Sequence, residues 1–182
     1  MGRPRNFSRE EVLQKAIPLF WRRGFADTSL QDLEKATGVN KSGLYSEFAS
    51  KEEIFLESLK YYLSQRDRSI LKREPLGWEN VRAYLRQSCP AGQEGGCLAV
   101  YSMRELSVVP DEVHDIISTS LEGVKRLIAK NIAATSVKAD ADLLAEIVLT
   151  FFIGLCLEQN LSRRKAASAR KIDGLIEIIS RS

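Results

Sequence analysis

Residues 28–48, TSLQDLEKATGVNKSGLYSEF, decide the fold of the N-terminal part of this chain. Thr28 or Ser29, each followed three residues later by Gln or Asp, predicts the start of a helix with a capping box. Gly38 predicts a sharp turn after that helix, and Asn40 predicts the cap of a second, short helix. The side chains expected to pack inward are Leu30, Leu33, Ala36, Val39 and Leu44. This order of elements is a helix-turn-helix.

The outer side of the second helix is short, polar or basic. Its members are Asn40, Lys41, Ser42, Gly43, Tyr45 and Ser46. Such a surface suits a helix that lies in the major groove of DNA. Gly43 costs a helix about 1 kcal/mol relative to alanine, which makes sense if the helix backbone must approach DNA closely. The alternative is a tightly packed helical hairpin in an interaction module without a DNA partner.

The rest of the chain is also helical in pattern. Capping boxes at Ser8 and Ser50 predict two further helix starts, and Gly24 predicts the end of the first helix. Pro18 lies inside that helix and is expected to kink it. Beyond a Pro- and Gly-containing connection at residues 72–77, helices are predicted at Trp78–Ser88, Cys97–Val108, Asp111–Ala134, Ala139–Leu161 and Lys165–Ile179. Without any strand pattern, the sequence predicts an all-α protein of about nine helices.

The charge of the chain is unevenly distributed. Its 182 residues carry 27 Lys and Arg against 24 Asp and Glu, a formal net charge of +3. Residues 1–51 hold nine basic and six acidic side chains, whereas the remainder holds 18 of each. A basic N-terminal region beside a neutral remainder favours nucleic-acid binding by the first domain.

Other composition features exclude several protein classes. The three cysteines, an odd number, exclude a disulfide framework and favour a reducing cytoplasm. His114 is the single histidine, so zinc sites and His-based clusters are disfavoured, and no cofactor or metal is expected. The polar residues 1–6 predict no signal peptide. The most apolar run, residues 143–157, contains Glu146 and is too short for a membrane span, so a buried helix is expected.

The helix-turn-helix region resembles the N-terminal domain of the TetR/AcrR family of transcriptional regulators. The resemblance is carried by residues 28–33, 36–48 and 50–52. It implies a DNA-binding helix-turn-helix domain at residues 1–51 and an effector-binding and dimerisation domain at residues 52–182. The implied function is a ligand-responsive regulator, most often a repressor, that binds a palindromic operator in double-stranded DNA as a homodimer. A small-molecule effector, unidentified from the sequence, would release it.

The resemblance also implies roles for individual residues. Phosphate contacts fall on Tyr45, Lys51 and either Thr28 or Ser29, and base contacts fall on Lys41, Ser42 and Gly43. The alternatives are a core aromatic role for Tyr45 beside Phe48 and a solvated lysine at residue 51. Two positions depart from the family pattern. Asn40 stands where many members have Ser or Thr, and Glu47 stands where an aromatic residue or His is common.

The extreme N-terminus adds a second candidate DNA contact. Arg3 and Arg5 flank Pro4, and an extended arm of this kind can place guanidinium groups in a narrow minor groove. The alternative is a disordered, solubilising tail.

The C-terminal domain is expected to form a dimer and an effector pocket. Residues 143–156 are apolar around most of the helix, and the last helix also carries several apolar residues. Both helices are therefore expected to bury this apolar surface against another surface. The predicted dimer-interface residues are Leu144, Val148, Phe152, Leu155, Leu175 and Ile179. The predicted pocket residues are Trp78, Tyr84, Tyr101, Met103, Phe151 and Phe152. The alternative for both sets is the core of a monomer.

Cys97 has two interpretations. It follows Glu94-Gly95-Gly96 at a predicted helix start, where the helix dipole lowers a thiol pKa, and this suits a sensor of oxidants or electrophiles. It also fits a buried structural cysteine. A more distant alternative is a hydrolase that uses Cys97 and His114 as nucleophile and base. No third orienting residue or glycine elbow accompanies them, so the chain is not expected to be an enzyme.

Overall fold

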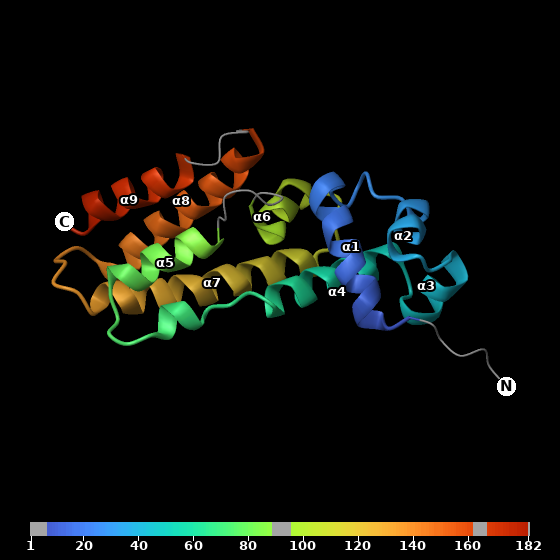
Figure 1. The fold of residues 1–182 in the computed structure, drawn as a ribbon, viewed down its shortest axis with the longest axis horizontal. Coiled ribbons are helices and arrows are strands. Elements are labelled where there is room, and N and C mark those ends of the chain that lie inside the picture. Colours follow the sequence, from blue (N-terminus) through green and yellow to red (C-terminus); the bar gives the residue numbers. More distant parts are fainter. Residues whose placement is uncertain (1–6, 89–95, 162–166, 182) are drawn as a thin grey trace. The chain divides into compact units, whose positions relative to one another are not determined.

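The computed structural model describes residues 7–88, 96–161 and 167–181, and these residues form helices and connecting turns without a strand (Figure 1). The α-helices are α1 Arg9–Arg23, α2 Leu30–Thr37, α3 Lys41–Glu47, α4 Lys51–Ser64, α5 Trp78–Ser88, α6 Leu98–Ser102, α7 Glu112–Ala133, α8 Ala141–Leu161 and α9 Ala167–Ile179. Two short 3-10 helices, η1 Ser69–Lys72 and η2 Met103–Glu105, lie between them. The predicted all-α class with nine α-helices is confirmed for the described part of the chain.

The helices pack into two compact units. Unit 1 comprises Met1–Arg66 with Tyr101–Ile117, and unit 2 comprises Asp67–Val100 with Ser118–Ser182. Packing therefore divides the chain differently from the functional boundary predicted after residue 51, because α4 packs against α1 and stays with unit 1. The functional boundary itself stays a prediction.

In unit 1, α1 packs against both α2 and α4 around an aromatic core. The Phe55 ring of α4 lies 5.0 Å from the Phe20 ring and 5.1 Å from the Phe25 ring, measured between centroids. Ser8 caps α1 with the predicted capping box, and the helix continues from Arg9 to Arg23 with Pro18 inside it. These contacts form the core of unit 1, in which α2 packs against α1 and α3 packs against α2.

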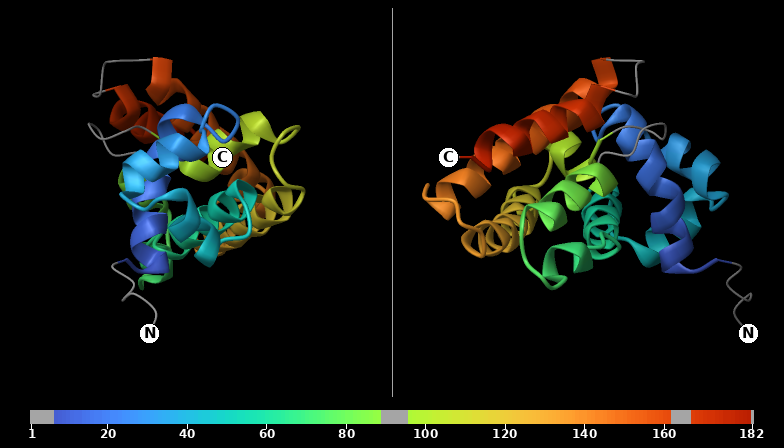
Figure 2. Two further views of the ribbon diagram at one scale, coloured as in Figure 1. Left: turned by 90° about the vertical axis from the view of Figure 1, so that its right-hand side faces the viewer. Right: turned by 60° about the vertical axis from the view of Figure 1, so that its left-hand side comes forward.

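In unit 2, α5 packs against η1 and α9. Arg86 of α5 donates to both carboxylate oxygens of Asp173 in α9 at 2.7 Å. Helices α8 and α9 lie side by side in Figures 1 and 2, and Lys171 of α9 pairs with Glu158 of α8. The interior of the unit is mostly aliphatic, and its buried side chains include Val81, Leu85, Ile128, Ile132, Val148 and Ile176.

Two local predictions are wrong. The helix predicted through Val108 ends at Ser102, and the chain then turns because the Glu105 carbonyl accepts the N–H groups of both Val108 and Val109. On α2, Ala36 is exposed and Thr37 is buried in its place. The Thr37 hydroxyl donates to the Leu33 carbonyl at 2.7 Å and accepts the Val39 N–H at 3.1 Å, which satisfies its polar atom in the core.

Among the described residues, no helix combines the length and the apolar character needed to cross a membrane.

Candidate nucleic-acid interface

The turn between α2 and α3 has the geometry that its residues predict. Gly38 ends α2 in the left-handed conformation (φ 76°), and its N–H donates to the Glu34 carbonyl at 2.9 Å. Asn40 caps α3, since its side-chain oxygen accepts the Gly43 N–H at 2.8 Å. The Glu34 carboxylate accepts the Lys41 N–H. The start of α3 is therefore fixed by acceptors from within the chain.

Helix α3 separates a buried side from an exposed one. Leu44 and Phe48 are at most 1% exposed and anchor the helix to unit 1. Four predicted DNA-binding residues lie on the exposed side: Lys41, Ser42, Tyr45 and Ser46. Tyr45 is 42% exposed, which excludes the core alternative. The Lys41 ammonium lies 5.8 Å from the centroid of its ring, so a cation and an aromatic hydroxyl are presented together.

Gly43 has an internal reason for lacking a side chain. A Cβ at this position would lie 2.7 Å from Val39 Cγ1 and 3.3 Å from both Asn40 Oδ1 and Phe7 Cε1. Val39 is buried and β-branched, so it cannot move aside easily. Packing against Val39 and Phe7 therefore already requires a glycine here, without the close approach of DNA that the sequence predicts.

Two predicted phosphate-contacting residues bond instead within the chain. Thr28 is 1% exposed, and its hydroxyl donates to the Gly24 carbonyl at 2.6 Å. Lys51 donates from Nζ to the carbonyls of Phe25 and Thr28, each at 3.0 Å, and stacks 4.1 Å from the Phe25 ring centroid. This excludes the solvated-lysine alternative for Lys51, and its role at phosphate stays a prediction.

Ser29 is the exposed member of the predicted Thr28/Ser29 pair. It forms the capping box of α2 with Asp32, and Asp32 pairs with Arg23 of α1 at 2.8 Å. The hydrogen bonds that Asp32 accepts from Ser29 lower its pKa most, and the positive charge of Arg23 lowers it further. The start of α2 is thus tied to the end of α1.

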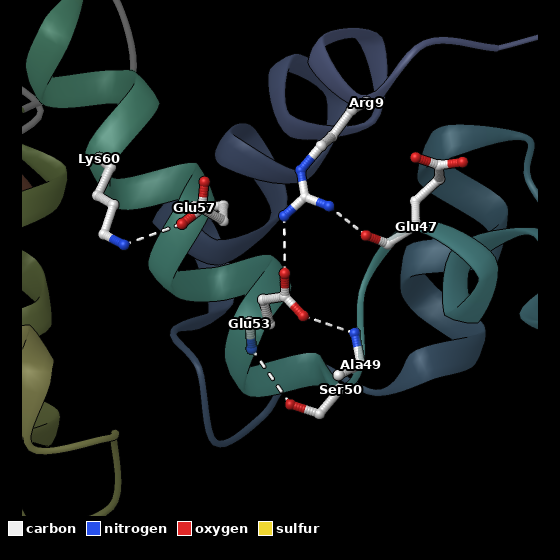
Figure 3. Close-up of polar contacts among 7 residues, drawn as sticks. All are labelled: Arg9, Glu47, Ala49, Ser50, Glu53, Glu57 and Lys60. Carbon is white, nitrogen blue, oxygen red and sulfur yellow. Dashed lines mark hydrogen bonds and ion pairs between the residues drawn. The ribbon is translucent and has the colours of Figure 1, made fainter.

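Arg9 and Glu53 join three helices through a contact that was not predicted from the sequence. Figure 3 shows the Arg9 guanidinium between the Glu47 carbonyl at the end of α3 and the Glu53 carboxylate of α4, with 2.7 Å to the latter. It also stacks 4.2 Å from the centroid of the Phe48 ring. Arg9 therefore holds the C-terminal end of α3 against α1 and α4. No short-range pattern relates residues 9, 47 and 53, so no sequence signal could have found this contact.

The capping box predicted at Ser50, with Glu53 as its second member, forms only in part. Ser50 caps α4 by accepting the Glu53 N–H at 3.2 Å, as predicted. The Glu53 carboxylate, however, accepts the Ala49 N–H at 2.6 Å, where a capping box requires the Ser50 N–H (Figure 3). The Ala49 bond, followed by Arg9, lowers the pKa of Glu53 below the ordinary value of 4.5.

This lowered pKa predicts a pH-dependent stability. Since the folded state favours the ionised Glu53, its contribution is present above the unfolded pKa and is lost as pH falls through the folded pKa. Glu53→Gln is expected to lower the free energy of unfolding at neutral pH by up to about 1 kcal/mol, because the group is partly exposed. In urea titrations over a pH series, this difference should disappear well below pH 4.5. Glu57→Gln, which removes the exposed pair with Lys60 at 2.9 Å, is the matched control. A Glu53→Gln difference that persists in acid contradicts the assignment.

The predicted effector-pocket residues fall into both units. Tyr101 and Met103 belong to unit 1, whereas Trp78, Tyr84, Phe151 and Phe152 belong to unit 2. Tyr84 and Phe152 are 5% and 4% exposed, with ring centroids 6.4 Å apart, so they pack as core residues. Tyr101 lines a pocket of about 260 Å³ in unit 1 together with Trp21 and charged residues at the end of α1. The effector site stays a prediction.

The predicted dimer-interface residues lie on the inner side of unit 2. Leu144, Val148, Phe152, Leu155 and Ile179 are buried within the chain, and Leu175 is half-buried. The exposed apolar residues of these two helices are Leu143, Ile147, Leu157 and Ile178. Helical periodicity explains the difference, because residues 143, 147 and 157 lie on a different side of α8 from 144, 148 and 155. The dimer interface on α8 and α9 stays a prediction.

Two other predicted residues, Cys97 and His114, lie outside the α2–α3 region. Cys97 is 6% exposed and directly precedes α6 in unit 2, whereas His114 is exposed and belongs to unit 1. Arg3 and Arg5 lie outside the described residues.

Comparisons with known proteins agree with this geometry. Residues 12–58 match the model of bacterial regulatory proteins of the tetR family. The transcriptional repressor ComR of Escherichia coli is 45% identical over 73 residues, which cover 40% of this chain and 33% of ComR. The E. coli repressor BdcR is 28% identical over 119 residues, covering 63% of this chain and 60% of BdcR. The matched stretches therefore span less than two thirds of either relative.

A solved structure extends the likeness to almost the whole chain. A cysteine mutant of CifR, a TetR family transcriptional regulator complexed with 26-bp double-strand operator DNA, is 29% identical with a TM-score of 0.84. The superposition covers 96% of this chain and 98% of that one. The matched N-terminal helices and the shared helical architecture show that the chain belongs to the TetR family of transcriptional regulators.

Proposed function

We propose that this protein is a ligand-responsive repressor that binds a palindromic operator as a homodimer and is released by a small-molecule effector. The exposed side of α3 carries this proposal. It presents Lys41, Ser42, Tyr45 and Ser46 on a helix anchored through two fully buried residues. ComR is a repressor, and the CifR structure contains operator DNA, which supports the same action here.

The homodimer is supported by the exposed apolar residues of unit 2. Leu143, Ile147, Leu157 and Ile178 are between 38% and 73% exposed on two helices that lie side by side. A two-fold axis through this surface would place it against its own copy and bury it. Two α3 helices could then enter half-sites about 34–36 Å apart, which a palindromic operator provides. An effector that changes this spacing would weaken binding.

The burial of Cys97 argues against a role in sensing oxidants or electrophiles. Reactive cysteines are partly exposed and lie in electropositive surroundings. Cys97 is 6% exposed, which favours the structural role.

Substitutions on α3 test the proposal directly. The wild-type protein is first titrated against the promoter regions nearest its own gene in a gel-shift assay at several salt concentrations. Lys41→Ala and Tyr45→Ala are each expected to weaken the selective complex about tenfold, since they remove contacts to phosphate or base. Tyr45→Phe, which retains the ring, separates the hydroxyl contribution.

Lys138→Ala is the matched control for Lys41→Ala. Lys138 is exposed in unit 2, so the substitution removes the same charge without touching α3. Thermal midpoints of all variants should equal that of wild type, because the side chains are exposed. Retained affinity in both α3 variants would exclude α3 as the interface. The absence of any salt-sensitive, sequence-selective complex would overturn the proposed function.

A further inference from the structure

The turn from α1 to α2, residues 24–28, is held by a carboxylate from a distant part of the chain. Glu105 Oε2 accepts the Phe25 N–H at 2.8 Å, and Glu105 Oε1 accepts the Ala26 N–H at 2.9 Å. We call this pair of bonds the Glu105 clamp. Because both oxygens of one carboxylate bind consecutive backbone N–H groups, the clamp fixes the direction of the turn as well as its position.

Gly24 lies directly against the Glu105 carboxylate. Its φ is +83°, a conformation that residues with a side chain adopt at a cost. A Cβ on Gly24 would lie 2.5 Å from Glu105 Oε2 and 2.7 Å from Oε1. A glycine at this position therefore serves both the turn and the close approach of the carboxylate.

The carbonyl groups of the same turn are also bound. Lys51 donates to the carbonyls of Phe25 and Thr28, and the Thr28 hydroxyl donates to the Gly24 carbonyl. Ser29, the cap of α2, follows directly. The turn is thus held from both sides, since Glu105 binds two of its N–H groups and Lys51 binds two of its carbonyls.

We propose that Glu105 is a positioning residue for DNA binding, which acts through this turn on the start of α2. This inference rests on the proposed function. An ordered turn holds Ser29 and α2 in place before DNA arrives, and α3 packs on α2. Without the clamp, the turn must be ordered during binding, and that loss of entropy lowers affinity.

The surroundings of the clamp separate this role from general stability. The Ala26 bond is exposed to solvent and the Phe25 bond is partly buried, so water can replace Glu105 at little cost to the fold. The pocket of about 260 Å³ in unit 1 is lined by Glu105, Gly24, Arg22 and Arg104. A small carboxylate such as acetate could therefore enter the space that a shortened side chain leaves.

The first experiment measures the clamp itself by amide hydrogen exchange of the full-length protein. Phe25 and Ala26 are expected to exchange faster in Glu105→Ala than in wild type. Glu112→Ala is the matched control, since Glu112 is an exposed glutamate of the same unit. Unchanged exchange at residues 25 and 26 in Glu105→Ala overturns the clamp.

The second experiment measures affinity for the selected operator fragment. Glu105→Ala is expected to bind about tenfold more weakly than Glu112→Ala, at an unchanged thermal midpoint. Acetate, exchanged for chloride at constant ionic strength, should restore part of this loss in Glu105→Ala and none in Lys41→Ala. Equal affinities of Glu105→Ala and Glu112→Ala overturn the positioning role while the proposed function stands.

A double-mutant cycle tests whether Gly24 and Glu105 act together. Gly24→Ala should weaken operator binding in wild type, through the clash with Glu105 and the positive φ. In the Glu105→Ala background the clash is gone, so the same substitution should cost less. Additive effects contradict the coupling. If wild type shows no selective binding, the proposed function and the role of Glu105 both fail, while hydrogen exchange still reports whether the clamp exists.

Discussion

Ile147→Asp is expected to convert the protein from a dimer to a monomer, with a dimer dissociation constant raised at least about 100-fold. Ile147 is 42% exposed in the first half of α8, between Leu143 and Leu157 on the same side of the helix. In the proposed homodimer this side is covered by a second copy. An aspartate there would be buried without a partner, whereas in the monomer it would face water. Dimerisation is therefore lost while the fold is retained.

Sedimentation velocity over a range of protein concentrations checks this result. Val108→Asp is the matched control, because Val108 is an apolar residue of unit 1 with 55% exposure. It introduces the same charge and should leave the oligomeric state unchanged. Since a monomer has only one α3 helix, Ile147→Asp should also bind the operator with lower affinity than wild type. A wild-type sedimentation coefficient for Ile147→Asp would show that this side of α8 is not the interface.

The second large effect is expected at Asn131, a buried polar residue of α7 that no sequence pattern singled out. Asn131 is fully buried, and its amide nitrogen donates to the carbonyls of Leu71 at 2.8 Å and Leu127 at 2.9 Å. Its side-chain oxygen accepts the Gly77 N–H at 3.1 Å and the Asn80 amide at 2.9 Å. One side chain therefore joins η1, the following loop and α5 to α7.

Asn131→Ala is expected to lower the free energy of unfolding by about 3 kcal/mol. The substitution leaves buried backbone groups without partners and opens a small cavity, and each of these is costly. Urea denaturation followed by circular dichroism measures the change.

Asn80→Ala is the comparison variant for this prediction, because it removes only one of the four hydrogen bonds of Asn131. Asn80 donates to the Arg73 carbonyl at 2.7 Å and the Pro75 carbonyl at 3.2 Å, in a more exposed place than Asn131. Its loss should cost about 1 kcal/mol. Equal losses for the two variants would show that Asn131 does not hold unit 2 together.

Short-range sequence patterns predicted the helices and their ends well. The capping boxes of Ser8 and Ser29, the Asn40 cap and the left-handed Gly38 are all present. Each depends on residues within a few positions of one another, so local geometry is sufficient to specify it. The exposed side of α3 was predicted for the same reason, because Leu44 sets which side is buried.

Long-range contacts could not be predicted. The Glu105 clamp spans 80 residues between Phe25 and Glu105, and the contact of Arg9 with Glu53 spans 44. No local spacing relates such pairs. The buried side of α8 could not be predicted for a different reason: the helix is apolar on nearly all sides, so the pattern does not show which side the chain itself covers.

The sequence by itself therefore determined the all-α class, the helix-turn-helix and the family, since these depend on local periodicity, caps and a short motif. Only the tertiary structure decided which of the predicted DNA-contacting residues are exposed and which form hydrogen bonds within the chain. It turned Thr28 and Lys51 inward, gave Gly43 a packing role and placed Glu105 on the α1–α2 turn. The physical reason is that a charged or hydroxyl side chain bonds to whatever packing brings within about 3 Å, and packing is a property of the whole chain.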